Sequence, residues 1–250
     1  MQESQPDSNA TARPQLGLGA CLAGQSVRYD GESNSANTHV LKILAQFEHR
    51  TFCPEVGIGL GVPRPPIHLV GETGAVQALD VAGHQHDYTM ALTRFAQHVL
   101  DSAPMLCAYI LVTGSPSCGN QGVKRFSAAG EHIASDQQGM FAQALGEYDP
   151  LMPCADDEQL TQRTIRKAFV IRAMAYHHWK LLLQRGLTQE RLRDFYCQHR
   201  YSLKTEDQDS HRVLQQIIDS SEAPISRETT GRHFISTLMG ALPRIHDLPN

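Results

Sequence analysis

Six cysteines are the residues with the clearest chemical potential in this chain of 250 residues. Three of them, Cys21, Cys53 and Cys118, lie in short turns rich in Gly, Pro, Ser and Ala, each close to the end of a predicted strand. Small neighbours let a ligand approach the backbone and leave amides free to donate to sulfur. Because ligands bind at the carboxyl ends of strands in α/β sheets, we expect these three thiols to share a metal or cluster site.

The other three cysteines, Cys107, Cys154 and Cys197, lack such surroundings. Cys107 lies inside an apolar run, where a cysteine behaves as a small buried hydrophobic residue. In an intracellular chain of this size, cysteines are typically buried thiols, metal ligands or catalytic groups rather than disulfide partners. We therefore expect these three to be bystanders.

Three thiolates with no obvious fourth ligand leave one coordination position open. In zinc this is the arrangement of a catalytic site, and in a 4Fe-4S cluster it leaves one iron free to bind substrate. The chain has neither the Cys-x₂-Cys pairs of structural zinc nor a deaminase signature. The spacing does not separate zinc from a cluster. A hydrolase with Cys118 as nucleophile is a further possibility, but it gives the other two thiols no role.

The elements that must position these residues are those of an α/β domain. Short apolar runs alternate with amphipathic segments over the first ~150 residues, which predicts a Rossmann-like sheet with mainly parallel strands. Residues 105–112 form a continuous apolar run, typical of a central strand. Other expected strands cover 16–20, 67–70 and 76–79, and helices are expected near 40–47, from Thr89 as a cap to 100, and from 140 to 145.

From Asp156 onward the pattern is wholly helical. One apolar stripe runs from Ile165 to Leu183, Thr188 is placed to cap the next helix, and weaker helices are expected at 211–219 and 233–242. We therefore predict a disordered leader over 1–14, an α/β cluster-binding domain over 15–155 and an all-α module over 156–250.

The leader is polar and has no signal-peptide pattern, and no stretch reaches the ~20 apolar residues that span a membrane, so we expect a cytoplasmic protein. The net charge of −4 gives no field that attracts nucleic acid. Arg163, Arg166, Lys167 and Arg172 could form a basic helix face. Without interleaved aromatic residues, this face is more typical of a solvated surface than of an RNA-binding one.

Three motifs resemble those of the thiouracil desulfidase family. They are Ala-Cys-Leu-Ala-Gly at 20–24 with Val-Arg-Tyr-Asp-Gly at 27–31, Cys-Pro-Glu-Val-Gly-Ile-Gly-Leu-Gly-Val-Pro-Arg-Pro-Pro at 53–66, and Ser-Pro-Ser-Cys-Gly at 115–119. They occur in the family's order within about residues 16–150. The resemblance implies a non-redox enzyme that uses water to convert 2-thiouracil or 4-thiouracil to uracil and hydrogen sulfide.

The resemblance also implies a cofactor and roles for individual residues. An oxygen-sensitive 4Fe-4S cluster would be held by Cys21, Cys53 and Cys118, with one iron not ligated by the protein. Glu55 and Ser115 would be the acid/base partners beside it. Arg64, between two prolines, could contact a substrate carbonyl or pair with Asp30.

The helical tail resembles the start of an uncharacterised module that is often fused to this domain, on the sequences at 168–176 and 195–201. Here the module is shortened, and Tyr196 stands where a histidine is expected. An alternative function remains open at this point: a metal- or cluster-containing binding or sensor module that acts on RNA or a protein partner.

Overall fold

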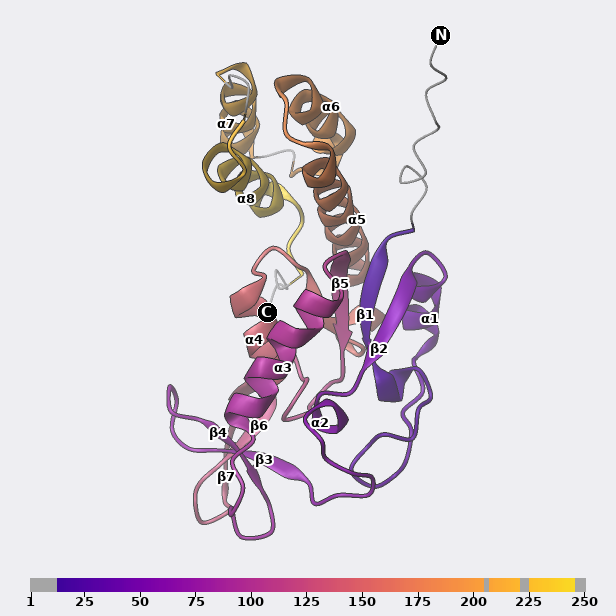
Figure 1. Ribbon diagram of the computed structural model, residues 1–250, viewed down its shortest axis with the longest axis vertical. Helices are drawn as coiled ribbons and strands as arrows, with labels where there is room; N and C mark the ends of the chain where they lie inside the picture. The colour runs from indigo at the N-terminus through magenta and orange to yellow at the C-terminus, as the bar shows by residue number, and fades with distance from the viewer. Residues whose placement is uncertain (1–12, 205–206, 221–224, 246–250) are drawn as a thin grey trace.

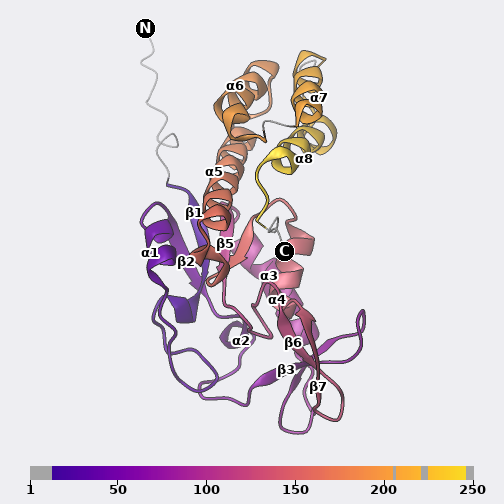
Figure 2. The same ribbon diagram turned by 180° about the vertical axis from the view of Figure 1, so that it is seen from behind.

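The structure is a computed structural model that describes residues 13–204, 207–220 and 225–245 (Figure 1). Except for residues 13 and 14, the predicted disordered leader lies outside these residues. The described chain contains an α/β part, in which two sheets lie at different levels, and a set of helices that extends from one end of it (Figures 1 and 2).

The first sheet contains four parallel strands in the order β2-β1-β5-β8. They are β1 (Gln15–Gly19), β2 (Glu48–Phe52), β5 (Leu106–Leu111) and β8 (Cys154–Asp156). All six residues of β5 are buried, so the apolar run identified in the sequence is an inner strand of the sheet. Gly17 lies beside Tyr109 on the neighbouring strand, and any side chain there would collide with its ring. The predicted α/β class with mainly parallel strands is confirmed.

The second sheet is mixed and has the order β4-β3-β6-β7. Its strands are β3 (Ile67–Val70), β4 (Gln77–Asp80), β6 (Val123–Phe126) and β7 (His132–Gln137). The two strands expected at 67–70 and 76–79 are present as β3 and β4 and pair in antiparallel orientation, and β6 pairs with β3 in parallel and with β7 in antiparallel orientation. The sequence analysis missed β6 and β7, because their short, largely polar sequences lack an apolar strand pattern.

Four helices belong to the α/β part: α1 (Thr38–Leu44), α2 (Pro54–Gly57), α3 (Thr89–Ser102) and α4 (Met140–Tyr148). Asn37 caps α1 by accepting from two backbone amides. The prediction that Thr89 caps α3 is wrong: Tyr88 holds the cap position without a side-chain bond. The hydroxyl of Thr89 instead accepts from the amide of Ala78 at 2.8 Å, and so ties the helix start to β4.

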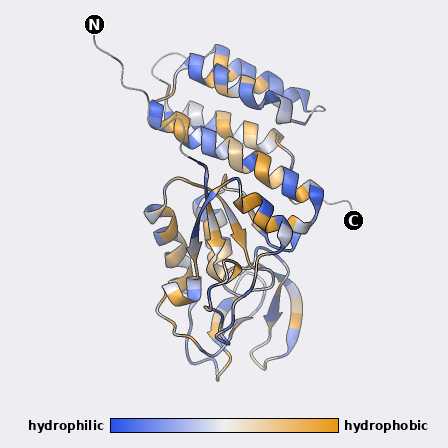
Figure 3. Ribbon diagram, turned by 90° about the vertical axis from the view of Figure 1, so that its right-hand side faces the viewer, coloured by the Kyte–Doolittle hydropathy of each residue, from blue (hydrophilic) through white to orange (hydrophobic). Residues whose placement is uncertain are grey.

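The C-terminal helices are α5 (Arg163–Arg185), α6 (Gln189–His199), α7 (Gln208–Asp219) and α8 (Arg232–Ala241). Thr188 caps α6 as predicted, accepting from the amide of Arg191 at 3.2 Å. Figure 3 shows hydrophobic and hydrophilic residues interleaved along these helices, the pattern of amphipathic helices. No helix in the described ranges is both long and apolar enough to cross a membrane.

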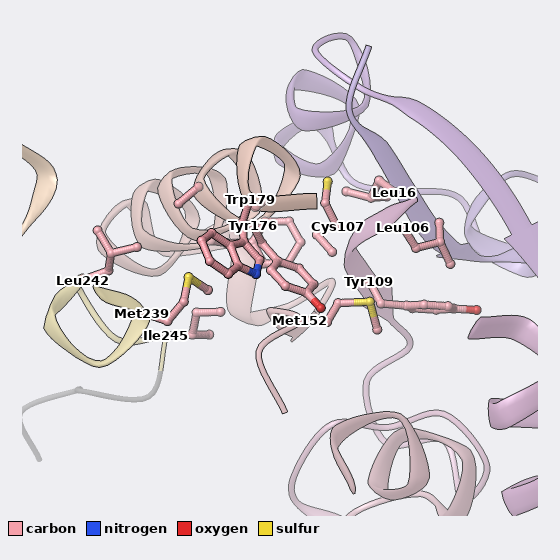
Figure 4. Packing of buried hydrophobic residues seen from close by; sticks show 14 of the residues in the cluster. Leu16, Leu106, Cys107, Tyr109, Met152, Tyr176, Trp179, Met239, Leu242 and Ile245 are labelled. Atoms are coloured by element: carbon pink, nitrogen blue, oxygen red, sulfur yellow. The ribbon is translucent and has the colours of Figure 1, made fainter. Parts of the chain in front are cut away.

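One hydrophobic core joins the helical part to the first sheet. Tyr176 and Trp179 of α5 lie between β5 and the C-terminal residues Met239 and Leu242 (Figure 4). The strand β8 ends at Asp156, so it crosses the predicted boundary between residues 155 and 156. The division into two domains at that point stays a prediction.

A half-buried polar cluster also holds α5 against the sheet. The ammonium of Lys180 donates to the carbonyls of Leu106 at 2.6 Å and Pro104 at 3.0 Å, and lies 3.6 Å from the carboxylate of Asp149. The hydroxyl of Tyr176 donates to the same carboxylate at 2.7 Å. These bonds fix the long helix across the end of β5.

We expect Lys180→Met to lower the free energy of unfolding by about 2–3 kcal/mol, because it keeps the aliphatic stem and removes hydrogen bonds made by a charged group. Urea unfolding at neutral pH measures the change. Lys167→Met on the same helix is the matched control, since Lys167 is exposed. An equal loss in the two variants would contradict this account of the junction.

Candidate active site

A cavity of about 520 Å³ lies beside the carboxyl ends of β1, β2 and β5 and is lined on another side by residues of β3 and β6. Its volume is in the range of small-molecule sites, roughly 300–1,000 Å³. All five residues that the sequence singled out, Cys21, Cys53, Glu55, Ser115 and Cys118, line this cavity. The structure therefore brings the predicted site residues together in one pocket.

Each of the three cysteines follows a strand of the parallel sheet. Cys21 lies in a single 3₁₀ turn directly after β1, and Cys53 lies between β2 and α2, where it takes the cap position of that helix. Cys118 follows β5 in a tight turn and is 8% exposed. The other three cysteines do not line the pocket: Cys107 is buried in β5, Cys154 begins β8 and Cys197 is exposed on α6.

Burial raises the pKa of each pocket thiol above the usual value, and the raised pKa of Cys118 is the most extreme of the three. Burial raises the pKa of Cys118 most, the hydrogen bond with Ser115 lowers it, and the nearby Cys21 raises it further, because two thiolates would repel each other. A catalytic cysteine nucleophile requires a lowered pKa. The pocket thus disfavours the hydrolase with Cys118 as nucleophile, and thiolates become favourable there only with a compensating cation.

The turn that carries Cys118 is held by Ser115. Its hydroxyl oxygen accepts from the amides of Ser117 at 3.3 Å and Cys118 at 3.2 Å, and lies 3.4 Å from the sulfur of Cys118. In neither of these two amide contacts does Ser115 use its hydroxyl hydrogen. Ser115 can therefore hold the turn and still donate that hydrogen into the pocket. The backbone of Gly139 lies so close to the carbonyl of Ser117 that a side chain there would meet it at 2.5 Å.

A buried carboxyl supports the same turn from behind. Asp156 is 1% exposed and accepts from the amide of Asn120 at 2.7 Å. Burial raises the pKa of Asp156 to about 6, against the pull of that hydrogen bond. The charged form of Asp156 is therefore disfavoured in the folded protein.

This carboxyl should make stability depend on pH. Because its pKa is about 6 when folded and 3.8 when unfolded, the folded protein binds more protons between those values. Its contribution to the free energy of unfolding is therefore largest at low pH and is lost as the pH rises toward 6. Asp156→Asn keeps an oxygen acceptor for Asn120, so we expect a weaker fall in stability between about pH 4.5 and 7. Urea unfolding of both metal-free proteins tests this, and an unchanged pH profile would contradict it.

The carboxylate of Glu55 is fixed at both oxygens. One oxygen accepts from Nε of Arg64 at 2.7 Å, and the other accepts from the hydroxyl of Ser117 at 2.8 Å. Arg64 also donates to the carbonyl of Val27 at 2.9 Å and is 6% exposed in its side chain. Each carboxylate oxygen retains further acceptor capacity toward the pocket.

One sequence-based interpretation of this region is wrong, and one contact was missed. Arg64 does not pair with Asp30, whose partner is Arg28 at 3.4 Å; it pairs with Glu55, because the turn at 57–66 folds back over α2. The sequence analysis also missed Ser117 as the second partner of Glu55. The signal for it was its place in the Ser-Pro-Ser-Cys turn, beside a predicted ligand.

The basic helix face is not a free surface. Arg166 donates to the carbonyls of Leu160 and Thr161, and Arg172 donates to the carbonyl of Met239 at 2.7 Å. Burial lowers the pKa of Arg172. Two of the four predicted basic residues therefore serve intramolecular bonds, which weakens the interpretation of this helix as an RNA-binding face.

These features define an α/β protein whose parallel sheet presents three cysteines to a small-molecule pocket. The sequence model of the 2-thiouracil desulfurase family matches residues 16–157. This match covers more than half of the 250 residues, and the chain belongs to that family. The helices α5 to α8 begin after the matched segment.

Two individual proteins are also similar. The uncharacterized protein YbbK of Bacillus subtilis (strain 168) is 30% identical over an alignment of 122 residues. The match covers 46% of this chain and 80% of that protein. A solved structure of the 4Fe-4S-dependent thiouracil desulfidase TudS has 30% identity and a TM-score of 0.49, and the match covers 59% of this chain and 93% of that one.

Proposed function

We propose that this protein is a desulfidase that hydrolyses a thiolated pyrimidine, 2-thiouracil or 4-thiouracil, to uracil and hydrogen sulfide. The observation that supports the proposal is the pocket, which is lined by Glu55, Ser115 and three cysteines that each follow a strand of the parallel sheet. The chain that forms it belongs to the 2-thiouracil desulfurase family. In the reaction, oxygen from water replaces sulfur on the ring carbon and sulfur leaves as hydrogen sulfide, so no electrons are exchanged.

The donor set fits an iron–sulfur cluster better than a single zinc ion. Within the described residues, no three His, Cys, Asp or Glu side chains are placed to hold one metal ion. A zinc ion would need each sulfur about 2.3 Å from a single point. A polynuclear cluster accepts sulfurs that line a pocket without converging, because each thiolate binds its own iron. Cys21, Cys53 and Cys118 would hold such a cluster.

When bound, a 4Fe-4S cluster with one iron not ligated by the protein supplies a soft Lewis-acid site that suits a thiocarbonyl sulfur. Glu55 accepts a proton from the attacking water, a role that typically contributes ~10²–10⁴-fold. Arg64 and Ser117 hold the two carboxylate oxygens, so the base is positioned before the substrate arrives. Ser115 donates its hydroxyl hydrogen to the water or to the ring.

Metal analysis of the protein purified without oxygen tests the cofactor. We expect a brown protein with about four irons per chain that bleaches in air. A colourless protein with one zinc per chain would contradict the proposal.

A further inference from the structure

The pocket has a second wall that none of the three sequence motifs describes. It is formed by His68 of β3 and by Lys124 and Phe126 of β6, all of which line the cavity. Side chains alternate along these strands. The neighbouring residues Ile67 and Val123 belong to a separate small core cluster and also reach the edge of the cavity.

His68 and Phe126 form a stacked pair on this wall. Their ring centroids are 4.0 Å apart and their planes differ by 7°. Both side chains are half-buried, whereas Lys124, two residues before Phe126 on β6, is exposed. His132 of β7 packs edge-on against Phe126 at 5.8 Å, but it does not line the pocket. The two stacked rings thus give the pocket an aromatic surface.

The protonation state of His68 bears on which groups it can bind. Burial, and then the nearby His84, lower the pKa of its imidazole, so the ring is neutral near pH 7. A neutral imidazole has one N–H donor and one nitrogen acceptor. The edge of a uracil ring presents N–H and C=O groups, and such an imidazole can form one hydrogen bond with either of them.

We propose that His68 and Phe126 are the ring-binding wall of the site: the flat pyrimidine packs edge-to-face against the pair, with a polar group at His68 and its sulfur directed toward the cysteines. This inference rests on the proposed function and names the substrate class within it. The preferred substrates are planar heteroaromatic thiones, and an acyclic compound such as thiourea should be a poor substrate because it has no ring to pack against the pair.

The test measures binding and turnover separately in the cluster-containing protein under anaerobic conditions. Calorimetry gives the Kd of uracil, which has the ring but no sulfur, and sulfide release gives kcat and KM for thiouracil. Phe126→Leu should raise both Kd and KM about tenfold, as expected when a ring loses an aromatic contact of about 1 kcal/mol, with kcat within about threefold. His68→Ala should also weaken uracil binding.

His132→Ala serves as the matched control. It removes a ring from the same cluster without changing the pocket wall. This variant should bind uracil as the wild type does. Iron content must be the same in all variants, so that a lost cluster is not mistaken for lost ring binding.

The possible outcomes separate this inference from the proposed function. If the wild type releases sulfide but Phe126→Leu and His68→Ala bind uracil normally, or if the wild type does not bind uracil, the ring-binding wall is wrong and the desulfidase stands. If uracil binding depends on Phe126 but thiouracil yields no sulfide, the proposed reaction is wrong and the ring site stands.

Discussion

Cys118→Ala protein, purified without oxygen, should be nearly colourless and contain less than about one iron per chain instead of about four. Cys118 is one of only three cysteines that line the pocket, and it is the most buried of them. Without it, only two thiolates would remain to hold the proposed cluster. Turnover of thiouracil should fall by more than about 100-fold, beyond the loss typical for outer-shell changes at metal sites.

The control for this experiment is Cys197→Ala, which removes an exposed thiol on α6 outside the pocket. It should keep both iron and activity. Circular dichroism of the two variants should show the same helical content, since Cys118→Ala removes a single sulfur from a turn that Ser115 holds through the backbone. A brown, iron-loaded Cys118→Ala protein would mean that the ligand set is wrong.

Glu55→Gln should have the opposite signature: full iron content and spectrum, with kcat lowered by roughly 10²–10⁴-fold. Glutamine retains an oxygen that can accept from Arg64 or Ser117, so the local structure is preserved while the base is lost. Iron analysis, the visible spectrum and sulfide release on one preparation measure all three quantities. A Glu55→Gln enzyme with undiminished kcat would show that another group handles the proton.

Ser117→Ala provides a graded comparison. Ser117 contacts Glu55 at 2.8 Å but does not line the pocket, so it acts by positioning the carboxylate. Losing one hydrogen bond to a charged group corresponds to roughly a tenfold effect or somewhat more. We therefore expect a smaller loss of kcat than in Glu55→Gln, with KM unchanged.

Local sequence patterns were sufficient to predict the α/β class and the grouping of three cysteines at the ends of strands. The central strand is a continuous apolar run, and Cys21, Cys53 and Cys118 stand in turns at strand ends, so both follow from neighbours in sequence. The helical tail followed in the same way from its apolar stripe and the cap at Thr188.

Contacts between distant segments were not predictable in this way. Ser117 and Glu55 are 62 residues apart in sequence, and their bond depends on how two turns meet over the sheet. The His68–Phe126 stack depends on the pairing of β3 with β6, a strand whose sequence, Val-Lys-Arg-Phe, has no apolar pattern to reveal it. Tyr196, unusual at its position, has its hydroxyl 2.8 Å from Nδ1 of His211, a contact between two helices.

The most direct test of the central claim is turnover by the wild-type protein without any added electron donor. Purified anaerobically and mixed with 2-thiouracil or 4-thiouracil, the protein should form uracil and sulfide in equal amounts over many turnovers, because water supplies the oxygen and no electrons are needed. Sulfide that appears only after a reductant is added, or an iron-loaded protein that releases none from either compound, would contradict a hydrolytic desulfidase at the three-cysteine pocket.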